Sequence, residues 1–373
     1  MKGKRVEFVF LSQEDLIQAG VLDMHRCVDV MDQAFTLLGQ GDYVMGGPSG
    51  NDHGLRLWFP KKPRGPRMPA AGPDRRFMAL VAYLGGEFDV CGAKWYGSNS
   101  KNPKEYDLPR SILTIILNDP TTGEPLAIMD GNLVSAMRTG AVMGLAAKYL
   151  AKKRVRVAGI VAAGVINKTC LLALADVLGE LREVKVFDIV EDKRIEFSEE
   201  MAESLGIDVH PVTSLEASIR DSDVISCAVS GEKRPYIKNE WVRDGAFLGL
   251  SSAAVELEEE LCLTSRVVAD NWKMHLNWRK EWQELPQEIK GFIPYAFIHS
   301  LITEGKMKDE NIGELGQEVM KTAESPHRDE KKTIFLSGGM AIEDLAWAYT
   351  MYKNAKKKGL GQKLTLWDEP FWL

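Results

Sequence analysis

The hydrophobic positions of the chain change their period near residue 155. From Asp130 to about Lys153, apolar residues recur at helical spacing, and basic residues gather at the far end, where they complement the negative pole of a helix. Val155 to Val161 is instead a short run rich in β-branched residues, which breaks at Ala162-Ala163-Gly164, and a new helical pattern begins at Thr169. The pattern therefore predicts a helix, a strand, a tight turn and a second helix, in that order.

Strand, turn and helix in this order are the setting of a dinucleotide-binding fingerprint. Aligning G-x-G-x-x-G with the turn places Ala162, Gly164 and Asn167 at the glycine positions, so only the middle glycine is present. Gly164 lets the backbone approach a pyrophosphate, whereas Ala162 must form the turn with a methyl group. On its own, the motif fits a cofactor turn and an ordinary strand-to-helix turn equally well.

A second short strand is predicted from Glu183 to Asp188, and it ends in the carboxylate of Asp188, about 24 residues after Gly164. Acids that bind the adenosine ribose are expected at a spacing of ~20 residues. A carboxylate here repels a 2′-phosphate, so Asp188 favours NAD(H), although Lys193 and Arg194 weaken that preference and leave NADP(H) possible. In the alternative interpretation, Asp188 caps the helix that follows.

Four further short apolar segments predict the remaining parallel strands of this domain. They are His210 to Val212, Val224 to Val229, Ala246 to Gly249 and Arg266 to Asp270. Ala228 and Ser230 come at the end of the second of these segments, where ligands of open α/β sheets lie against strand carboxyl ends. Small residues of an ordinary turn are the alternative.

The N-terminal part alternates like an antiparallel sheet, with two strands predicted in Phe77 to Trp95 and a hairpin in Ile112 to Met129. A long segment rich in Gly, Pro and Arg precedes it and contains a short apolar element around Arg56. Because Arg56 alternates with Leu55 and Leu57, we expect it to project from a strand on the opposite side from them. A plain solvated arginine is the alternative.

Two cations lie in apolar surroundings. Lys94 stands inside an apolar strand, where an ammonium is costly unless it meets an anion, either a structural carboxylate or a substrate. Arg138 stands in the middle of the helix that begins at Asp130, and the partner that its guanidinium matches best is a carboxylate.

Composition narrows the function classes. The 373 residues suit two domains, and the net charge of -6 is spread along the chain without a basic block, which argues against nucleic acid as the main partner. No apolar run approaches the ~20 residues of a membrane span, and the N-terminus lacks the apolar core of a signal peptide. The five cysteines are odd in number and mostly lie in apolar runs, so we expect reduced thiols in a cytoplasmic protein. The histidines show no metal-ligand spacing, and no catalytic metal is expected.

The order of these segments resembles the ornithine cyclodeaminase/mu-crystallin family, from about Lys94 to Leu364. The segments that carry the resemblance are Gly92 to Lys94, Asp119 to Pro125, Met129 to Gly131, Arg138 to Ala141, Ala162 to Gly164 and Ser337 to Asp344. Val165-Ile166-Asn167 is more similar to the family branch that includes the dehydrogenase making diaminopropionate for siderophores.

The resemblance implies a fold and an activity. The expected fold is α/β, with a doubly wound Rossmann domain (residues 151–304) inserted in a mixed α+β substrate-binding and dimerisation domain (residues 1–150 and 305–373). The implied activity is NAD(P)-dependent hydride transfer at the carbon–nitrogen bond of an α-amino acid or its imine, in a homodimer.

The resemblance also assigns roles to residues. Lys94 and Arg138 match the cations that hold the substrate carboxylate, Arg56 matches a third, and Gly338 and Gly339 approach the nicotinamide. The positions that correspond to cofactor contacts are Ala162, Gly164, Val165, Ile166, Asn167, Asp188, Ala228, Ser230, Leu250, Ser251, Gly338 and Gly339. Taken from the residues alone, the paired glycines indicate only close packing or an anion-friendly helix start.

One departure from the family bears on the reaction. The cyclodeaminases carry an aspartate in the loop after the fifth Rossmann strand, and here residues 249–255 contain no carboxylate. This favours an imine reductase or amino-acid dehydrogenase over a cyclodeaminase. Lys94 is the expected proton-handling group, ahead of a water held by Ser251 or Ser252. A cyclodeaminase and a non-catalytic, crystallin-like binding protein are the alternatives.

Overall fold

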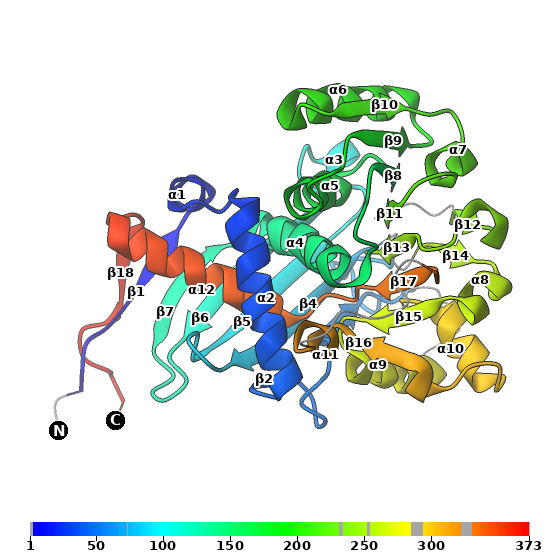
Figure 1. Cartoon of the computed structure of the whole chain (residues 1–373). Helices are drawn as coiled ribbons and strands as arrows, with labels where there is room; N and C mark the ends of the chain where they lie inside the picture. Colours follow the sequence, from blue (N-terminus) through cyan, green and yellow to red (C-terminus); the bar gives the residue numbers. More distant parts are fainter. Residues whose placement is uncertain are drawn as a thin grey trace. The chain divides into compact units, whose positions relative to one another are not determined.

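The computed structural model describes residues 3–72, 74–230, 234–251, 254–284, 294–321 and 330–372. The chain forms two compact units (Figure 1). The first unit comprises Met1–Asp23, Gly41–Ser135 and Met340–Leu373, and the second comprises Met24–Gln40 and Ala136–Gly339. No helix of the described residues is long and apolar enough to cross a membrane.

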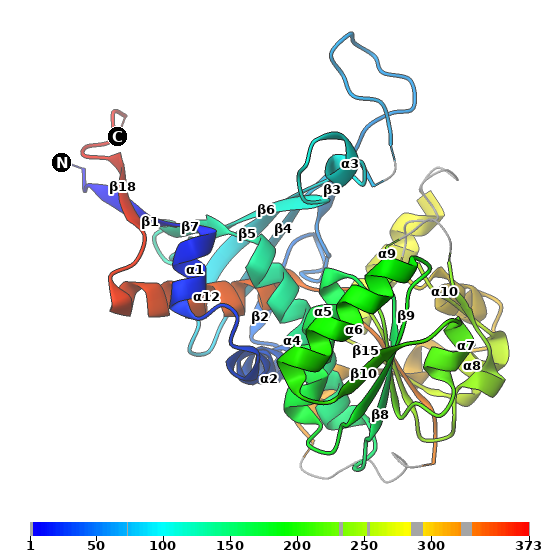
Figure 2. The same ribbon diagram turned by 90° about the horizontal axis from the view of Figure 1, so that it is seen from above.

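The first unit is built on an eight-stranded sheet in the order β18-β1-β7-β6-β5-β4-β2, with β3 also paired to β4 (Figure 2). Its strands are β1 (Val6–Leu11), β2 (Tyr43–Met45), β3 (Leu55–Trp58), β4 (Arg76–Leu84), β5 (Val90–Ser98), β6 (Ser111–Asn118), β7 (Pro125–Asp130) and β18 (Gln362–Trp367). Its helices are α1 (Gln13–Ala19), α3 (Asn102–Glu105) and α12 (Ala341–Lys358). In Figure 2 the long segment between β3 and β4 extends away from the sheet.

The alternation of the sequence decides which face of this sheet is covered. On β4, Met78 and Leu80 are buried, while Phe77 and Val81 on the other face are exposed. Helix α12 packs on the buried face, where a side chain at Gly92 would meet Leu345. The other face of the sheet therefore presents apolar side chains to solvent.

The second unit is built on an eight-stranded parallel sheet in the order β10-β9-β8-β11-β13-β17-β15-β16. Its strands are β8 (Val157–Val161), β9 (Glu183–Phe187), β10 (Asp208–Pro211), β11 (Val224–Cys227), β13 (Phe247–Leu250), β15 (Arg266–Ala269), β16 (Ile312–Glu314) and β17 (Thr333–Leu336), with a separate pair formed by β12 (Tyr236–Ile237) and β14 (Glu256–Leu257). Its helices are α2 (Met24–Gln40), most of α4 (Asn132–Leu150), α5 (Val165–Val177), α6 (Glu191–Leu205), α7 (Leu215–Ile219), α8 (Glu259–Thr264), α9 (Trp272–Glu284), α10 (Ala296–Thr303) and α11 (Leu315–Val319).

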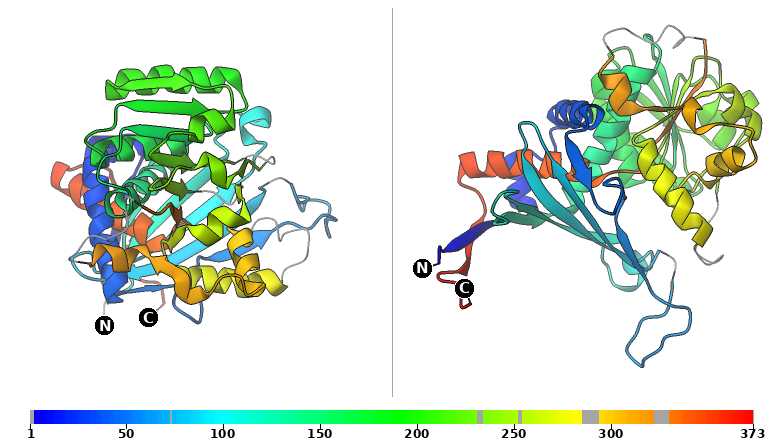
Figure 3. Two further views of the ribbon diagram at one scale, coloured as in Figure 1. Left: turned by 45° about the vertical axis from the view of Figure 1, so that its right-hand side comes forward. Right: turned by 90° about the horizontal axis from the view of Figure 1, so that it is seen from below.

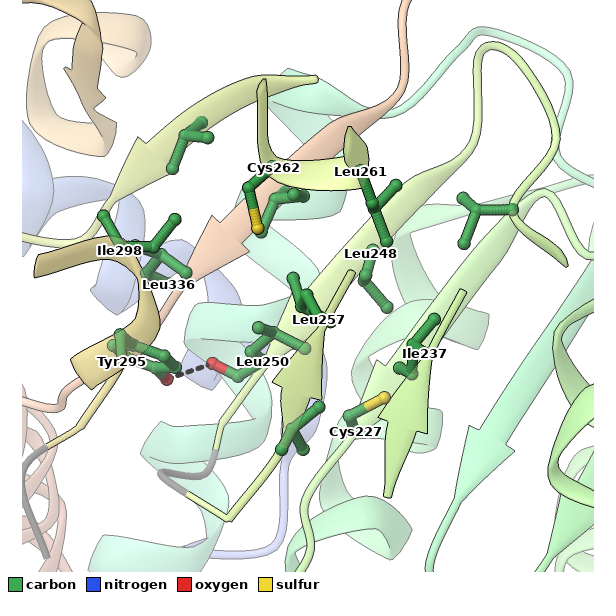
Figure 4. Packing of buried hydrophobic residues seen from close by; sticks show 14 of the residues in the cluster. Cys227, Ile237, Leu248, Leu250, Leu257, Leu261, Cys262, Tyr295, Ile298 and Leu336 are labelled. Carbon is green, nitrogen blue, oxygen red and sulfur yellow. Dashed lines mark hydrogen bonds between the residues drawn. The ribbon is translucent and has the colours of Figure 1, made fainter. Parts of the chain in front are cut away.

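This sheet has helices on both faces (Figure 3). Its central strands β11, β13 and β17 are buried along their whole length, as expected for parallel strands covered on both sides. Figure 4 shows part of the core, in which Tyr295 packs beside Leu336 and Ile298. The expected α/β class with a Rossmann-like sheet and a second domain is confirmed.

The observed units differ from the expected domain boundaries. Residues 305–339 stay with the Rossmann sheet, because β17 pairs with β13 on one side and β15 on the other. Helix α2 also belongs to the second unit, where α11 packs against it. The boundary near residue 150 moves to Ser135, within α4.

Candidate active site

The turn after β8 leads directly into helix α5. Ala162 adopts a positive φ of 79°, so this alanine makes a turn for which glycine is the usual residue. Gly164 is the N-cap of α5, no side chain caps this helix end, and a Cβ at Gly164 would meet no atom within 4 Å. The first N–H groups of α5 therefore face open space, and such a helix start suits a pyrophosphate.

Asn167 braces this turn from inside. It is fully buried, and its Nδ2 donates to the carbonyl oxygens of Val161 (2.7 Å) and Ala162 (2.6 Å). Its Oδ1 accepts a hydrogen bond from the Ser226 hydroxyl at 2.8 Å, which ties the turn to β11. Three hydrogen bonds within the protein thus occupy the side chain that stands where the fingerprint has its third glycine.

Asp188 is held against the same turn. Its Oδ2 accepts from the N–H of Ala163 (2.9 Å) and its Oδ1 from the N–H of Val190 (2.8 Å). The N-cap of α6 is Val190, so Asp188 lies two residues before that cap and joins the ends of β8 and β9. Arg194, considered as a partner for a 2′-phosphate, binds Glu191 and the Asp188 carbonyl oxygen instead.

The other expected cofactor positions of this unit follow the carboxyl ends of its strands. Sheet order reverses at β8, which has β9 on one side and β11 on the other, and this is where open α/β sheets bind ligands. These positions are Val165 and Ile166 at the start of α5, Ala228 and Ser230 after β11, Leu250 at the end of β13, and Ser251. Ser252, considered as a water-holding residue, lies outside the described residues.

Two buried groups hold the loop that contains Gly338 and Gly339. Asp270 accepts hydrogen bonds from the N–H groups of Gly338 (2.5 Å) and Gly339 (2.8 Å), and its other oxygen lies 3.0 Å from His275 Nε2. Tyr295 Oη lies 2.7 Å from the Ser337 carbonyl oxygen and 2.6 Å from that of Leu250 (Figure 4). Sequence reasoning missed Asp270, although an acid at a strand end was a usable signal.

Arg138 lies against this loop. It is buried, and a Cβ at Gly339 would stand only 2.8 Å from its Nη1. Gly339 has a φ of 78°, so this position requires glycine for both its conformation and its space. The Arg138 guanidinium therefore lies beside the backbone of the loop that was expected to approach the nicotinamide.

Lys94 has a carboxylate partner. Its Nζ lies 2.5 Å from Asp344 Oδ2 and 3.4 Å from the Ser135 hydroxyl, and both Lys94 and Asp344 are buried. Of the two sources considered for its anion, the structure supplies a protein carboxylate, in the first turn of α12. Lys94 and Asp344 therefore form a buried ion pair between β5 and α12.

Arg56 projects as its alternation predicts. In the register of β3 and β4, Arg56 is opposite Met78, on the face that also carries Leu80 and Lys94. Its neighbours Leu55 and Leu57 are exposed on the other face. Arg56 and Lys94 thus share one side of the first unit's sheet, whereas Arg138 belongs to the second unit.

The cysteines and histidines show no reactive arrangement in the described residues. Burial raises the pKa of the Cys170 thiol, on α5, to about 12. No group of three His, Cys, Asp or Glu side chains in that part of the chain gathers at metal-binding distance.

A sequence model described as the ornithine cyclodeaminase/mu-crystallin family matches residues 21–359. The chain belongs to this family. The resemblance drawn from the motifs is therefore confirmed, and it extends further toward the N-terminus than Lys94, where the motif comparison began.

Individual family members match over nearly their full length. The N-((2S)-2-amino-2-carboxyethyl)-L-glutamate dehydrogenase of Staphylococcus aureus is 30% identical over 367 residues, which cover 97% of this chain and 99% of that protein. The Thermococcus litoralis Delta(1)-pyrroline-2-carboxylate reductase, solved with NADH and L-proline, has a TM-score of 0.80 and 28% identity, covering 95% of this chain and 99% of that one. An archaeal alanine dehydrogenase dimer with bound NAD has a TM-score of 0.77 and 27% identity, covering 97% and 100%.

Proposed function

We propose that this protein is an NADH-dependent oxidoreductase that acts on the carbon–nitrogen bond of an α-amino acid or its imine. The observation that carries the proposal is the turn at Ala162–Gly164 with Asp188 fixed against it, in a family whose solved members include NAD and NADH complexes. When bound, the reduced cofactor supplies a hydride to the imine carbon.

The cofactor residues support NADH over NADPH. The Asp188 carboxylate is positioned by two backbone N–H groups, and there it would accept hydrogen bonds from ribose hydroxyls and repel a 2′-phosphate. Arg194 is engaged with Glu191, so it is not arranged to bind that phosphate. NADPH use remains compatible with the site at lower efficiency.

Three cations would hold the substrate carboxylate. Arg138, Arg56 and Lys94 match the family's substrate cations, and Ser135, which lies 3.4 Å from Lys94, precedes Arg138 by one helical turn on α4. A guanidinium fixes the plane of a carboxylate through paired hydrogen bonds. Holding the imine in one orientation removes part of the barrier, an effect of up to ~7–11 kcal/mol in ideal intramolecular cases.

The Lys94–Asp344 pair would handle the proton. The Lys94 ammonium would donate a proton to the substrate nitrogen, and Asp344 would hold it in position. In the cyclodeaminases an aspartate in the corresponding loop, which here follows β13, handles the proton. That loop contains no carboxylate in this chain, so we assign proton handling to Lys94 and Asp344. Asp344 thus joins Lys94 and Arg138 among the proposed catalytic residues.

We also propose that the active form is a homodimer joined through the outer face of the first unit's sheet. Exposed apolar side chains from β3, β4, β5 and β6 gather on that face, and the strand register places them on one side. They are Leu55, Leu57, Phe77, Val81, Trp95 and Ile112. Phe77 stacks on Trp95 with ring centroids 5.7 Å apart.

A second copy of the chain is the occupant that this face suits best. Monomeric proteins rarely leave a contiguous apolar surface of this kind in water. The archaeal alanine dehydrogenase with the same fold is a dimer. The side chains named on this face are aromatic and aliphatic, whereas nucleic acids and membrane surfaces are usually bound through basic groups.

The five cysteines support a reducing compartment. All five lie within the described residues, where none forms a disulfide, and four are buried. We therefore propose that the protein acts in the cytoplasm.

The proposal is tested by a screen for NADH oxidation. Purified protein is given 2-oxo acids with ammonia or simple amines, and cyclic imines such as pyrroline-2-carboxylate, each with NADH or NADPH. Turnover of at least one imine with NADH is expected. In a separate reaction with ornithine and a catalytic amount of NAD⁺, release of ammonia would instead identify a cyclodeaminase. Binding of NADH without any turnover would identify a non-catalytic protein.

A further inference from the structure

A second cationic cluster lies at one end of the first unit's sheet. Arg76 and Arg110 both bind the carboxylate of Asp74, Arg76 through Nη1 and Arg110 through Nη2 and through Nε at 2.8 Å. Ser98 donates to the same carboxylate. Two guanidinium groups share one carboxylate, so this set of charges is net positive.

The guanidinium of Arg76 is fixed in place but not saturated. It lies over the rings of Trp58 and Tyr96, 5.5 and 5.4 Å from their centroids, which sets its plane. Its Nε is buried and has no hydrogen-bond partner among the described residues, so that nitrogen is closed to a ligand. A further anion would reach Arg76 through the 20% of its side chain that is exposed.

The cluster is aligned with Lys94. On β5, Lys94, Tyr96 and Ser98 project to the same face, because alternate residues of a strand do so. Arg76 is opposite Ser98, and Arg56 shares a cross-strand row with Tyr96. Successive rows lie roughly 7 Å apart at ~3.4 Å per residue. Positive groups thus follow one another along this face, from Lys94 through Arg56 to Arg76.

We propose that Arg76 and Arg110 bind a second carboxylate of the substrate, distant from the one held near Lys94. The inference rests on the proposed function and adds the substrate class to it. That class is an amino acid or imine whose side chain or nitrogen substituent ends in a carboxylate, roughly 7–13 Å from the group at Lys94. The rings of Trp58 and Tyr96 would contact the apolar chain between the two charges.

The test compares substrates that differ only in the distal carboxylate. Reductive amination with ammonia and NADH is measured for 2-oxooctanoate and for 2-oxosuberate, which has the same chain length and a terminal carboxylate. The wild type is expected to prefer 2-oxosuberate by at least about tenfold in kcat/KM, worth roughly 1.4 kcal/mol. Arg110→Gln and Arg76→Gln are expected to reduce that ratio to near one.

Arg67→Gln is the matched control. Arg67 is an exposed arginine in the segment between β3 and β4, and the change removes the same charge as Arg76→Gln. It should keep the wild-type ratio. If all three variants keep it, or if the wild type shows no preference, the inference is wrong. Arg110→Gln is less disruptive to the fold than Arg76→Gln, because 40% of the Arg110 side chain is exposed and its replacement disturbs less packing.

A binding measurement separates this inference from the proposed function. Suberate and octanoate are titrated by calorimetry into the NADH-loaded protein. If no substrate oxidises NADH but suberate binds about tenfold more tightly than octanoate, and Arg110→Gln abolishes the difference, the proposed function fails and the subsite stands. Equal affinities would overturn the subsite whatever the enzyme assay shows.

Discussion

Lys94 Nζ lies 2.5 Å from Asp344 Oδ2, and both side chains are buried. The two residues are 250 positions apart in the sequence, yet the sheet and α12 bring them together in the first unit. A buried pair of this kind is a weak source of stability by itself, because the desolvation of both ions offsets their attraction. Because the pair lies on the face proposed to hold substrate, we expect it to contribute to catalysis more than to stability.

Breaking the pair should separate stability from catalysis. Lys94→Met leaves the Asp344 carboxylate buried without its cation, and should lower the free energy of unfolding by about 3–5 kcal/mol. The double variant Lys94→Met with Asp344→Leu should recover most of that loss, because no buried charge remains, while activity stays at least 100-fold below wild type. Urea unfolding and NADH oxidation are the two measurements.

Lys356→Met is the control for this series, since Lys356 is an exposed lysine on the same helix as Asp344. This variant should keep the wild-type free energy of unfolding and the wild-type rate of NADH oxidation. A double variant with near wild-type kcat would remove the pair from the reaction and leave it a purely structural feature.

The pair also marks the limit of sequence reasoning at this site. An ammonium in an apolar strand had to meet an anion, and that argument correctly required a partner for Lys94. It did not identify Asp344, because an acid in the first turn of a helix already has a sufficient explanation in the helix dipole. Only the packing of α12 on β5 shows that Asp344 also pairs with Lys94 and does not merely complement the helix dipole.

Asp188 should set the preference between the two nicotinamide cofactors. Asp188→Asn keeps an oxygen that accepts from the turn but removes the charge that repels a 2′-phosphate. The ratio of kcat/KM for NADH over NADPH should fall at least about tenfold, roughly 1.4 kcal/mol. Asp192→Asn, an exposed acid on α6, is the control. An unchanged ratio in Asp188→Asn would mean that the carboxylate does not face the adenosine ribose.

His299 should make the fold sensitive to acid. Burial, and after it the electrostatic effect of nearby His275 and Arg279, lowers the pKa of His299 from 6.5 to about 3. Between these two values the unfolded chain binds one proton more than the folded one, so stability falls as pH decreases below 6.5, by up to about 1.4 kcal/mol per pH unit. In His299→Leu this contribution is absent, and its urea-unfolding free energy should fall less steeply between pH 6.5 and 4.5.

The matched control for that comparison is His210→Gln, which replaces a partly exposed histidine on β10. It should keep the wild-type pH slope. Parallel stability curves for wild type and His299→Leu would show that His299 is protonated in the folded protein.

The outer face of the sheet should hold the dimer together. Trp95 is 52% exposed and stacks on Phe77 at the middle of that face. Trp95→Asp places a charge where the second copy is proposed to pack, and should shift the protein from dimer to monomer by at least 100-fold in dissociation constant. Sedimentation velocity measures the shift. Tyr106→Asp, at an exposed aromatic residue just after α3, is the control and should leave the dimer intact.

Local patterns predicted most elements but not their spatial order. The period change near residue 155 located β8, the turn and α5, and the alternation around Lys94 located β4 and β5. The insertion of β17 between β13 and β15 was not predictable, because a buried apolar strand carries no mark of its neighbours. The expected boundaries assigned residues 305–339 to the substrate-binding domain, whereas in the structure they belong to the second unit. Asp270, which binds the N–H groups of Gly338 and Gly339, was not predicted as a site residue.

The most direct test of hydride transfer to carbon is isotopic. NADH carrying deuterium at the transferred position of C4 is incubated with the protein, ammonia and the best 2-oxo acid or cyclic imine, and the product amino acid is analysed by mass spectrometry and NMR. One deuterium per molecule at the α-carbon is the predicted result. Product formed without deuterium at that carbon would contradict the proposed reaction.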